Sequence, residues 1–159
     1  SQRGRAAAFF PTGTYAQMLA RRPVMVRVGD SIFVHGGIEP SWIQKTGGLD
    51  AINSDTAAWL RGEKENPPKA ITANDGPLWS RLYSDDDEID PNRCVALGQT
   101  LLKLNAKRMV VGHTVQDHIN STCNDGVWRI DVGMTAYYGG PIEVLELRGN
   151  NVRVLKEGP

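Results

Sequence analysis

Two short apolar runs, each ending at a histidine beside glycine, constrain the fold of this chain most strongly. Residues 33–37 read Phe-Val-His-Gly-Gly, and residues 110–114 read Val-Val-Gly-His-Thr. Apolar runs of this kind, rich in β-branched residues and ended by glycine, are typical of buried strands. A strand fixes the position of an imidazole at its end, and a neighbouring glycine lets a ligand or a second backbone segment approach closely. The two runs therefore predict a sheet with His35 and His113 at strand ends.

The remaining pattern predicts a mixed α/β fold in one domain, residues 1–159, with strands dominating the second half. Residues 24–28 and 31–35 flank Gly29-Asp30, which favours a tight hairpin with a type II′ turn. Thr14 and Gln17 are spaced as a capping box at the start of a helix that Pro23 ends. Further helices are expected over residues 48–61 and 93–105. Further strands are expected over 107–111, 118–123, 127–132, 141–147 and 151–155, and surface loops over 62–76 and 84–92, the second one acidic.

Composition excludes several classes of protein. Lys+Arg and Asp+Glu both number 18, so the formal net charge is zero and nothing indicates a nucleic-acid partner. No apolar run approaches the roughly 20 residues that span a bilayer, so no membrane partner is expected. The first residues lack the apolar segment of a secretory signal and an initiator Met, so we expect the chain to begin inside a longer protein. The compartment is not written in the sequence, although an intracellular one is favoured over secretion.

The two cysteines, Cys94 and Cys123, form no CxxC motif. A bridge between them is open to the sequence, but free thiols in a reducing compartment are the favoured interpretation.

His35 and His113 are candidate metal ligands, because imidazole commonly binds zinc, iron and manganese. A single histidine at a strand end is more often a packed, hydrogen-bonded residue. Two of them, 78 residues apart, can nevertheless converge on one metal ion if their strands are neighbours.

Residues 35–40, His-Gly-Gly-Ile-Glu-Pro, resemble the HGGxxP segment of phosphoprotein phosphatases and related metallophosphoesterases. Residues 112–114 match the later GH[TS] motif of the bacterial-type branch. Residues 77–84, 107–114 and 128–134 are similar to the Shewanella-like protein phosphatases in particular. This resemblance implies a four-layer α-β-β-α metallophosphoesterase sandwich with mixed sheets. The chain would then be the C-terminal portion of a single catalytic domain.

The same resemblance implies a two-metal site. In that family two ions, usually Mn, Fe or Zn, activate a bridging hydroxide and hold phosphate oxygens for in-line attack. His35 and His113 match ligands of one ion. The other ligands come from GDxHG, GDxxDRG and GNHE motifs, which this chain lacks. A complete site would need the missing N-terminal half, and the chain alone is expected to be inactive.

Three further residues are candidates for the site, each with a structural alternative. The Arg81 guanidinium suits phosphate oxygens, but it can equally pair with the acidic residues 85–87. Asp131 can orient a ligand histidine or serve as a turn carboxylate at a strand end. The resemblance implies that Tyr137 lines the pocket, with ordinary packing as the alternative. His118 is expected at the surface.

The resemblance implies a metal-dependent phosphomonoesterase with a phosphoprotein substrate and a phosphotyrosine preference. Two alternatives stay open: a non-catalytic module that binds a phosphorylated ligand or a partner, and a hydrolase of small phosphate esters or dinucleoside polyphosphates. The natural substrate, the metal and the oligomeric state are not fixed by the sequence.

Overall fold

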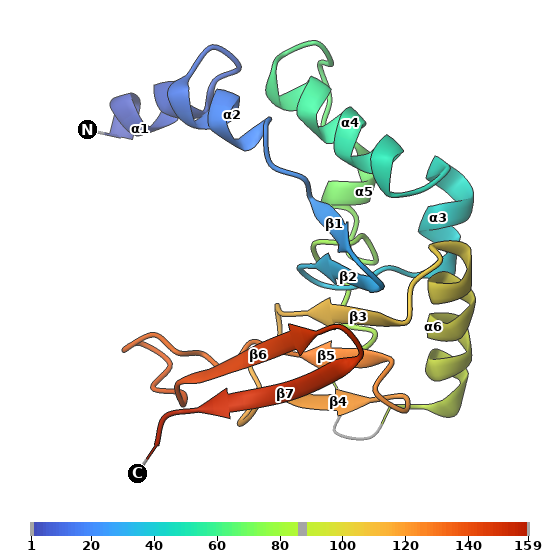
Figure 1. Cartoon of the computed structure of the whole chain (residues 1–159). Helices are drawn as coiled ribbons and strands as arrows, with labels where there is room; N and C mark the ends of the chain where they lie inside the picture. The colour runs from blue at the N-terminus through green and yellow to red at the C-terminus, as the bar shows by residue number, and fades with distance from the viewer. Residues whose placement is uncertain (1, 86–88, 159) are drawn as a thin grey trace.

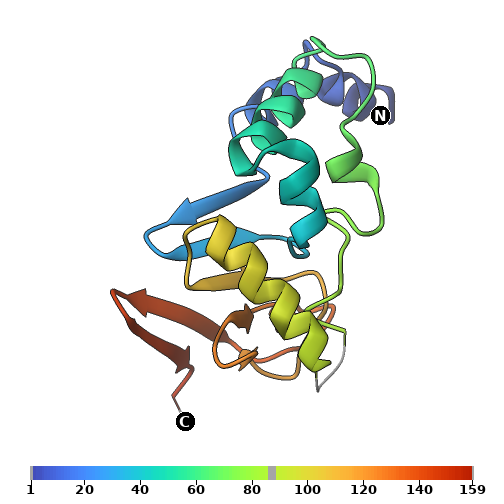
Figure 2. The same ribbon diagram turned by 90° about the vertical axis from the view of Figure 1, so that its right-hand side faces the viewer.

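The computed structural model describes residues 2–85 and 89–158. A five-stranded sheet carries helices against one face, while a two-stranded hairpin lies in front of the other (Figures 1 and 2). The elements in chain order are α1 (Gln2–Phe9), α2 (Thr14–Leu19), β1 (Met25–Val28), β2 (Ser31–Val34), α3 (Pro40–Thr46), α4 (Leu49–Leu60), α5 (Lys69–Thr72), α6 (Pro91–Lys103), β3 (Arg108–Val111), β4 (Asn120–Thr122), β5 (Val127–Arg129), β6 (Glu143–Arg148) and β7 (Asn151–Lys156).

The sheet is mixed, with strand order β1-β2-β3-β5-β4. The three central strands β2, β3 and β5 are parallel to one another. The edge strands are antiparallel to their neighbours, β1 to β2 and β4 to β5. Gly29 has a φ of 60° and Asp30 stays outside the left-handed region, as a type II′ hairpin turn requires. The predicted α/β class, the mixed sheet and the hairpin are confirmed. Because β2 and β3 are parallel, the residues that follow them emerge at the same edge of the sheet.

The hydrophobic core lies between this sheet and the helices. Strand side chains alternate, so every second residue of β1, β2, β3 and β5 points toward the helical layer. Helices α3, α4 and α6 supply apolar side chains from the other side. The buried residues of this core include Met25, Ile32, Val34, Trp42, Ile52, Leu97, Leu101, Met109, Val111 and Val127.

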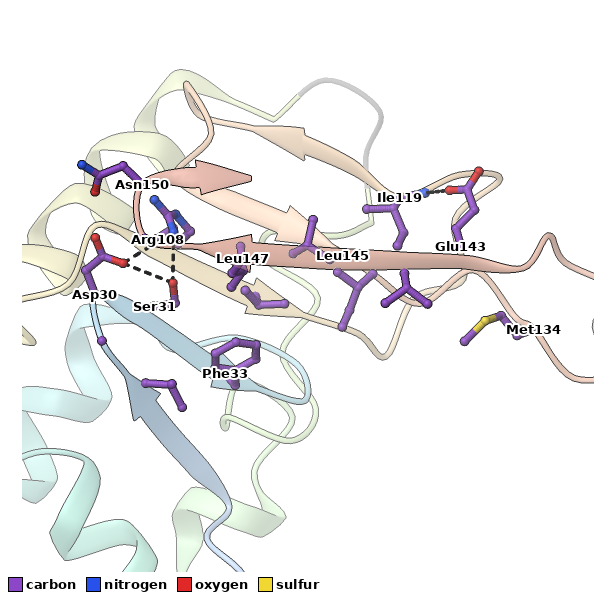
Figure 3. A pocket seen from close by; sticks show the side chains of 16 residues that line it. Asp30, Ser31, Phe33, Arg108, Ile119, Met134, Glu143, Leu145, Leu147 and Asn150 are labelled. Atoms are coloured by element: carbon purple, nitrogen blue, oxygen red, sulfur yellow. Dashed lines mark hydrogen bonds and ion pairs between the residues drawn. The ribbon is translucent and has the colours of Figure 1, made fainter. Parts of the chain in front are cut away.

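The opposite face of the sheet is covered less completely. The β6-β7 hairpin lies over it, and a cavity of about 750 Å³ remains between them (Figure 3). Apolar side chains from both layers line this cavity, among them Phe33, Val110, Leu145 and Leu147. Val28, the last residue of the edge strand β1, remains 60% exposed. The hairpin is therefore a partial second layer.

The cysteine expectation was wrong, because Cys94 and Cys123 form a disulfide with Cα atoms 5.3 Å apart. The first turn of α6 lies beside the β4-β5 turn, and this tertiary contact brings the two thiols within bridging distance.

Two local expectations also need correction. Residues 62–76 are not wholly loop, because α5 forms there and buries Ala70. The capping box does not form, since α2 begins after Gly13 and the Gln17 side chain donates to the Pro11 carbonyl instead. The predicted helices over 48–61 and 93–105 correspond to α4 and α6. Residues 86–88 of the predicted acidic loop lie outside the described residues. Within the described ranges, no helix is both long and apolar enough to cross a membrane.

Candidate metal and phosphate site

The two predicted histidines meet at one edge of the sheet. The Nε2 atom of His35 lies 3.0 Å from the Nδ1 atom of His113, and the ring centroids are 4.8 Å apart. Parallel pairing of β2 with β3 brings the two strand ends level, and the Gly112 amide extends this pairing by donating to the His35 carbonyl at 2.9 Å. Residues 78 positions apart therefore converge through backbone register.

The backbone at His113 is in the left-handed region, with a φ of 68°. A non-glycine residue there costs about 1–3 kcal/mol, and such strain clusters at functional sites. Burial lowers the pKa of His113, and the positive charge of Arg81 and the neighbouring His35 lower it further. The imidazole is thus favoured in its neutral form, which is the form that binds metal ions.

A loop at residues 76–81 is fixed against the glycines that follow His35. The Pro77 carbonyl accepts hydrogen bonds from the amides of Gly36 at 2.8 Å and Gly37 at 3.2 Å. A β-carbon at Gly36 would lie 2.7 Å from the Ser80 carbonyl oxygen, so only glycine permits this approach. The contact explains why a strand-end glycine is needed here, and it positions the side chains of Trp79 and Arg81.

Arg81 lies beside His113. Its Nη1 atom donates to Thr114 Oγ1 at 2.9 Å and to the His113 carbonyl at 3.4 Å. The alternative ion pair is also present, because Asp85 Oδ1 lies 3.8 Å from Nη1. Both groups are about half exposed, so this pair contributes little to stability. The Arg81 guanidinium therefore lies next to His113 and remains accessible to solvent.

Sequence reasoning missed two neighbours of this cluster. Thr114 joins Arg81 to Ser84, whose hydroxyl lies 2.8 Å from that of Thr114. Trp79 packs its ring edge-on against His113 with centroids 5.9 Å apart, yet it is 53% exposed. The only available signal was their position inside the motifs at residues 77–84 and 112–114.

Asp131 and Tyr137 are placed differently from each other. Asp131 lines the same shallow hollow as His35 and His113, where its Oδ1 atom accepts a hydrogen bond from the Gly133 amide at 3.1 Å. Its orienting role stays a prediction, because that hydrogen bond joins Asp131 to the Gly133 amide and not to an imidazole. Tyr137 is 89% exposed and meets the Tyr138 ring edge-on, outside that hollow. The predicted role of Tyr137 in lining the pocket is not supported by this position, and it stays a prediction.

The histidine pair fits two ligand positions of one ion. Two nitrogens each about 2.1 Å from a tetrahedral metal would lie about 3.4 Å apart, so the two rings, which are within hydrogen-bond distance at 3.0 Å here, would separate slightly to share an ion. Within residues 2–85 and 89–158, no group of three or more His, Cys, Asp or Glu side chains is arranged to hold a metal. The described residues thus offer part of a ligand set.

Comparisons with known proteins show which sequences and folds this chain is similar to. The chain is 37% identical, over 99% of its length, to Shewanella-like protein phosphatase 2 of Arabidopsis thaliana, and 38% identical, over 82% of its length, to Shewanella-like protein phosphatase 1 of Plasmodium berghei. It covers 41% and 38% of those proteins. A crystal structure of the cold-active protein-tyrosine phosphatase of a psychrophilic Shewanella species superimposes with a TM-score of 0.68 at 24% identity, over 86% of this chain and 41% of that one. No family model matches the chain.

The fold is a mixed α/β sandwich, similar to that of the Shewanella enzyme. More particularly, the chain resembles the Shewanella-like protein phosphatases, as its motifs predicted, and it spans about 40% of the length of these relatives.

Proposed function

We propose that this chain is the C-terminal portion of the single catalytic domain of a metal-dependent phosphomonoesterase. The observation that carries the proposal is the convergence of His35 and His113 at one sheet edge, with the Arg81 guanidinium beside them. Motif order supports the C-terminal placement, because the motifs that supply the other ligands in the family precede HGG. The relatives named above are phosphatases, which supports the reaction class.

In this proposal His35 and His113 hold one of two divalent ions, Mn, Fe or Zn. Two bound ions supply a hydroxide at neutral pH and neutralise charge on the transferring phosphoryl group. Arg81 binds phosphate oxygens with its planar fork, and Thr114 holds that fork in place. Asp131, which lines the hollow, orients a ligand histidine. The remaining ligands come from outside the 159 residues, so the chain by itself is inactive.

We further propose a phosphoprotein substrate of the phosphotyrosine type. The Shewanella enzyme is named as a protein-tyrosine phosphatase. The half-exposed indole of Trp79 beside His113 supports an aromatic substrate, because offset or edge-on contacts between rings add to binding.

The test is carried out in the longer protein that contains this chain. His113→Ala is expected to abolish hydrolysis of a phosphotyrosine peptide and to lower the bound metal measured by mass spectrometry. Arg81→Lys is expected to keep the metal and to lower kcat/KM by about 10²-fold, since loss of a preorganised donor typically costs about that much. Arg61→Gln removes an exposed cation that pairs with Glu63, and it serves as the control. Full activity with unchanged metal in His113→Ala would refute the proposal.

A non-catalytic binding module is the second candidate. The finding that favours it is the incomplete ligand set within the described residues. Such a module would bind a phosphotyrosine peptide without releasing phosphate, even with added Mn²⁺. The third candidate, hydrolysis of small phosphate esters or dinucleoside polyphosphates, predicts that these compounds are cleaved faster than the peptide.

A further inference from the structure

A second polar groove lies at the other end of the sheet from the histidine pair. It is a cavity of about 780 Å³ between the start of β3, the β4-β5 turn and the β6-β7 hairpin. From Arg108 to His113 the chain advances five residues, about 15 Å in an extended strand. This groove is therefore separate from the candidate metal site. Its lining includes Lys107, Arg108, Asn124, Asp125, Trp128, Glu146, Arg148, Asn150, Asn151 and Arg153.

Cations exceed carboxylates around this groove. Its lining holds four cationic residues and two acidic ones, Asp125 and Glu146. Arg148 reaches Glu146 through its Nε atom at 3.1 Å, and Arg153 binds the same carboxylate. Two guanidinium groups carry ten N–H donors, more than one carboxylate can accept.

The other two cations are also only partly neutralised. Lys107 and Arg108 share Asp30, at 3.0 and 3.5 Å. Lys107 also donates to the Asn150 side chain at 2.8 Å and remains 60% exposed. Figure 3 shows Asp30, Arg108 and Asn150 at the same end of the sheet. With Asp30 included, four positive charges still face three negative ones.

A buried donor without an acceptor marks the same groove. The indole Nε1 of Trp128 is inaccessible to solvent, and no described residue accepts its hydrogen bond. Leaving such a donor unpaired costs about 1–3 kcal/mol, so native structures rarely do so. Trp128 lines the groove together with the surplus cations. Because this N–H is closed to solvent, a ligand in the groove contacts it only if the side chain moves, and the surplus cations carry the inference.

We infer that this groove binds an acidic peptide segment. Its volume lies within the range of sites for ligands much larger than one phosphate ion. The cations suit side-chain carboxylates, while the amide groups of Asn124, Asn150 and Asn151 offer both donors and acceptors, as a peptide backbone requires. A polyphosphate would use the cations but has no donors for the amide oxygens. The inference rests on this groove alone and does not depend on the proposed phosphatase activity.

The test measures fluorescence anisotropy of labelled hexaglutamate with the longer protein that contains this chain. Lys107→Gln combined with Arg148→Gln removes two exposed cations yet leaves Arg108 on Asp30 and Arg153 on Glu146. We expect affinity to fall at least about tenfold, because charge-assisted hydrogen bonds are lost. The matched control, Arg61→Gln with Lys64→Gln, removes two exposed cations elsewhere and should leave the affinity unchanged. His113→Ala should also leave it unchanged, which separates this result from the fate of the proposed function.

Two further readouts decide the ligand class. The indole N–H resonance of Trp128, assigned with Trp128→Phe, should shift when hexaglutamate binds, because bound carboxylates change the surroundings of a side chain that lines the groove. A stationary resonance at saturating peptide would overturn the inference. Equal binding of hexaglutamine would overturn it too, as would binding of tripolyphosphate without binding of hexaglutamate.

Discussion

The two faces of the five-stranded sheet differ in how completely this chain covers them. On the helical face, side chains such as Ile32, Met109 and Val127 have no exposed surface. On the hairpin face, the same strands present Phe33 and Val110 to a cavity of about 750 Å³, and Val28 is 60% exposed. One sheet is thus a closed core on one side and a partly open surface on the other.

This difference indicates which face of the sheet contributes more to the stability of the chain. A sheet buries its apolar face only where another layer supplies matching side chains. Helices α3, α4 and α6 do so within the 159 residues, whereas β6 and β7 cover only part of the second face. We therefore expect changes on the helical face to dominate the free energy of unfolding.

The largest expected effect comes from the disulfide, which ties α6 to the β4-β5 turn beside the helical core. Replacing Cys94 and Cys123 by Ala should lower the free energy of unfolding by about 3–4 kcal/mol, because a loop of some 30 residues is no longer closed in the unfolded chain. Urea denaturation measures this loss. A reductant should destabilise the unsubstituted protein equally and leave the double variant unaffected. Titration of two free thiols in the native protein would contradict the disulfide.

The same deletion on the two faces tests the comparison directly. Val127→Ala removes two methyl groups from a fully buried site, and it should cost about 1–3 kcal/mol. Val28→Ala removes the same groups from a mostly exposed side chain, and it should cost less than about 0.5 kcal/mol. Denaturant midpoints of both variants give the two values. Equal losses would show that the hairpin face is as well packed as the helical face.

Local patterns predicted the strands of this fold and helices α2, α4 and α6. The hairpin around Gly29 and Asp30 follows from turn chemistry and β-branched runs, which act over a few residues. The strands before His35 and His113 follow from apolar runs that glycine ends. Helices α1, α3 and α5 were not predicted. Of these, α3 and α5 span only seven and four residues, too few to establish a helical period.

Non-local contacts set the limits of prediction at the site. The meeting of His35 with His113 depends on parallel pairing of β2 and β3, which the sequence permits but does not require. The place of Arg81 depends on the Pro77 carbonyl, which binds amides some 40 residues earlier in the chain. The disulfide likewise needed the packing of α6 to be known. The resemblance to a family supplied roles for residues whose spacing alone left them open.

The last difference between the faces concerns how the hairpin is held. Glu143, at the start of β6, has a side chain only 1% exposed. It accepts hydrogen bonds from the Ile119 amide at 2.7 Å and from Lys156 at 2.9 Å, while His118 Nδ1 lies 2.7 Å away. The hydrogen bond from Lys156, and then those from the Ile119 amide and His118, lower the pKa of Glu143 to about 2. A charged group thus anchors the layer over the open face, whereas apolar packing closes the other.

The last expected effect depends on pH. A carboxyl whose pKa is lower in the folded state stabilises it above its unfolded value of 4.5, and this stabilisation is lost as the pH falls toward 2. Glu143→Gln should unfold at a lower temperature than the unsubstituted protein at pH 7, and the two melting temperatures should converge between pH 4.5 and 2. Glu63→Gln changes an exposed carboxyl whose pKa Arg61 also lowers, so it should show a smaller gap at pH 7. A gap for Glu143→Gln that stays constant down to pH 2 would mean that the charge of Glu143 does not hold the hairpin, and that both faces depend on apolar packing alone.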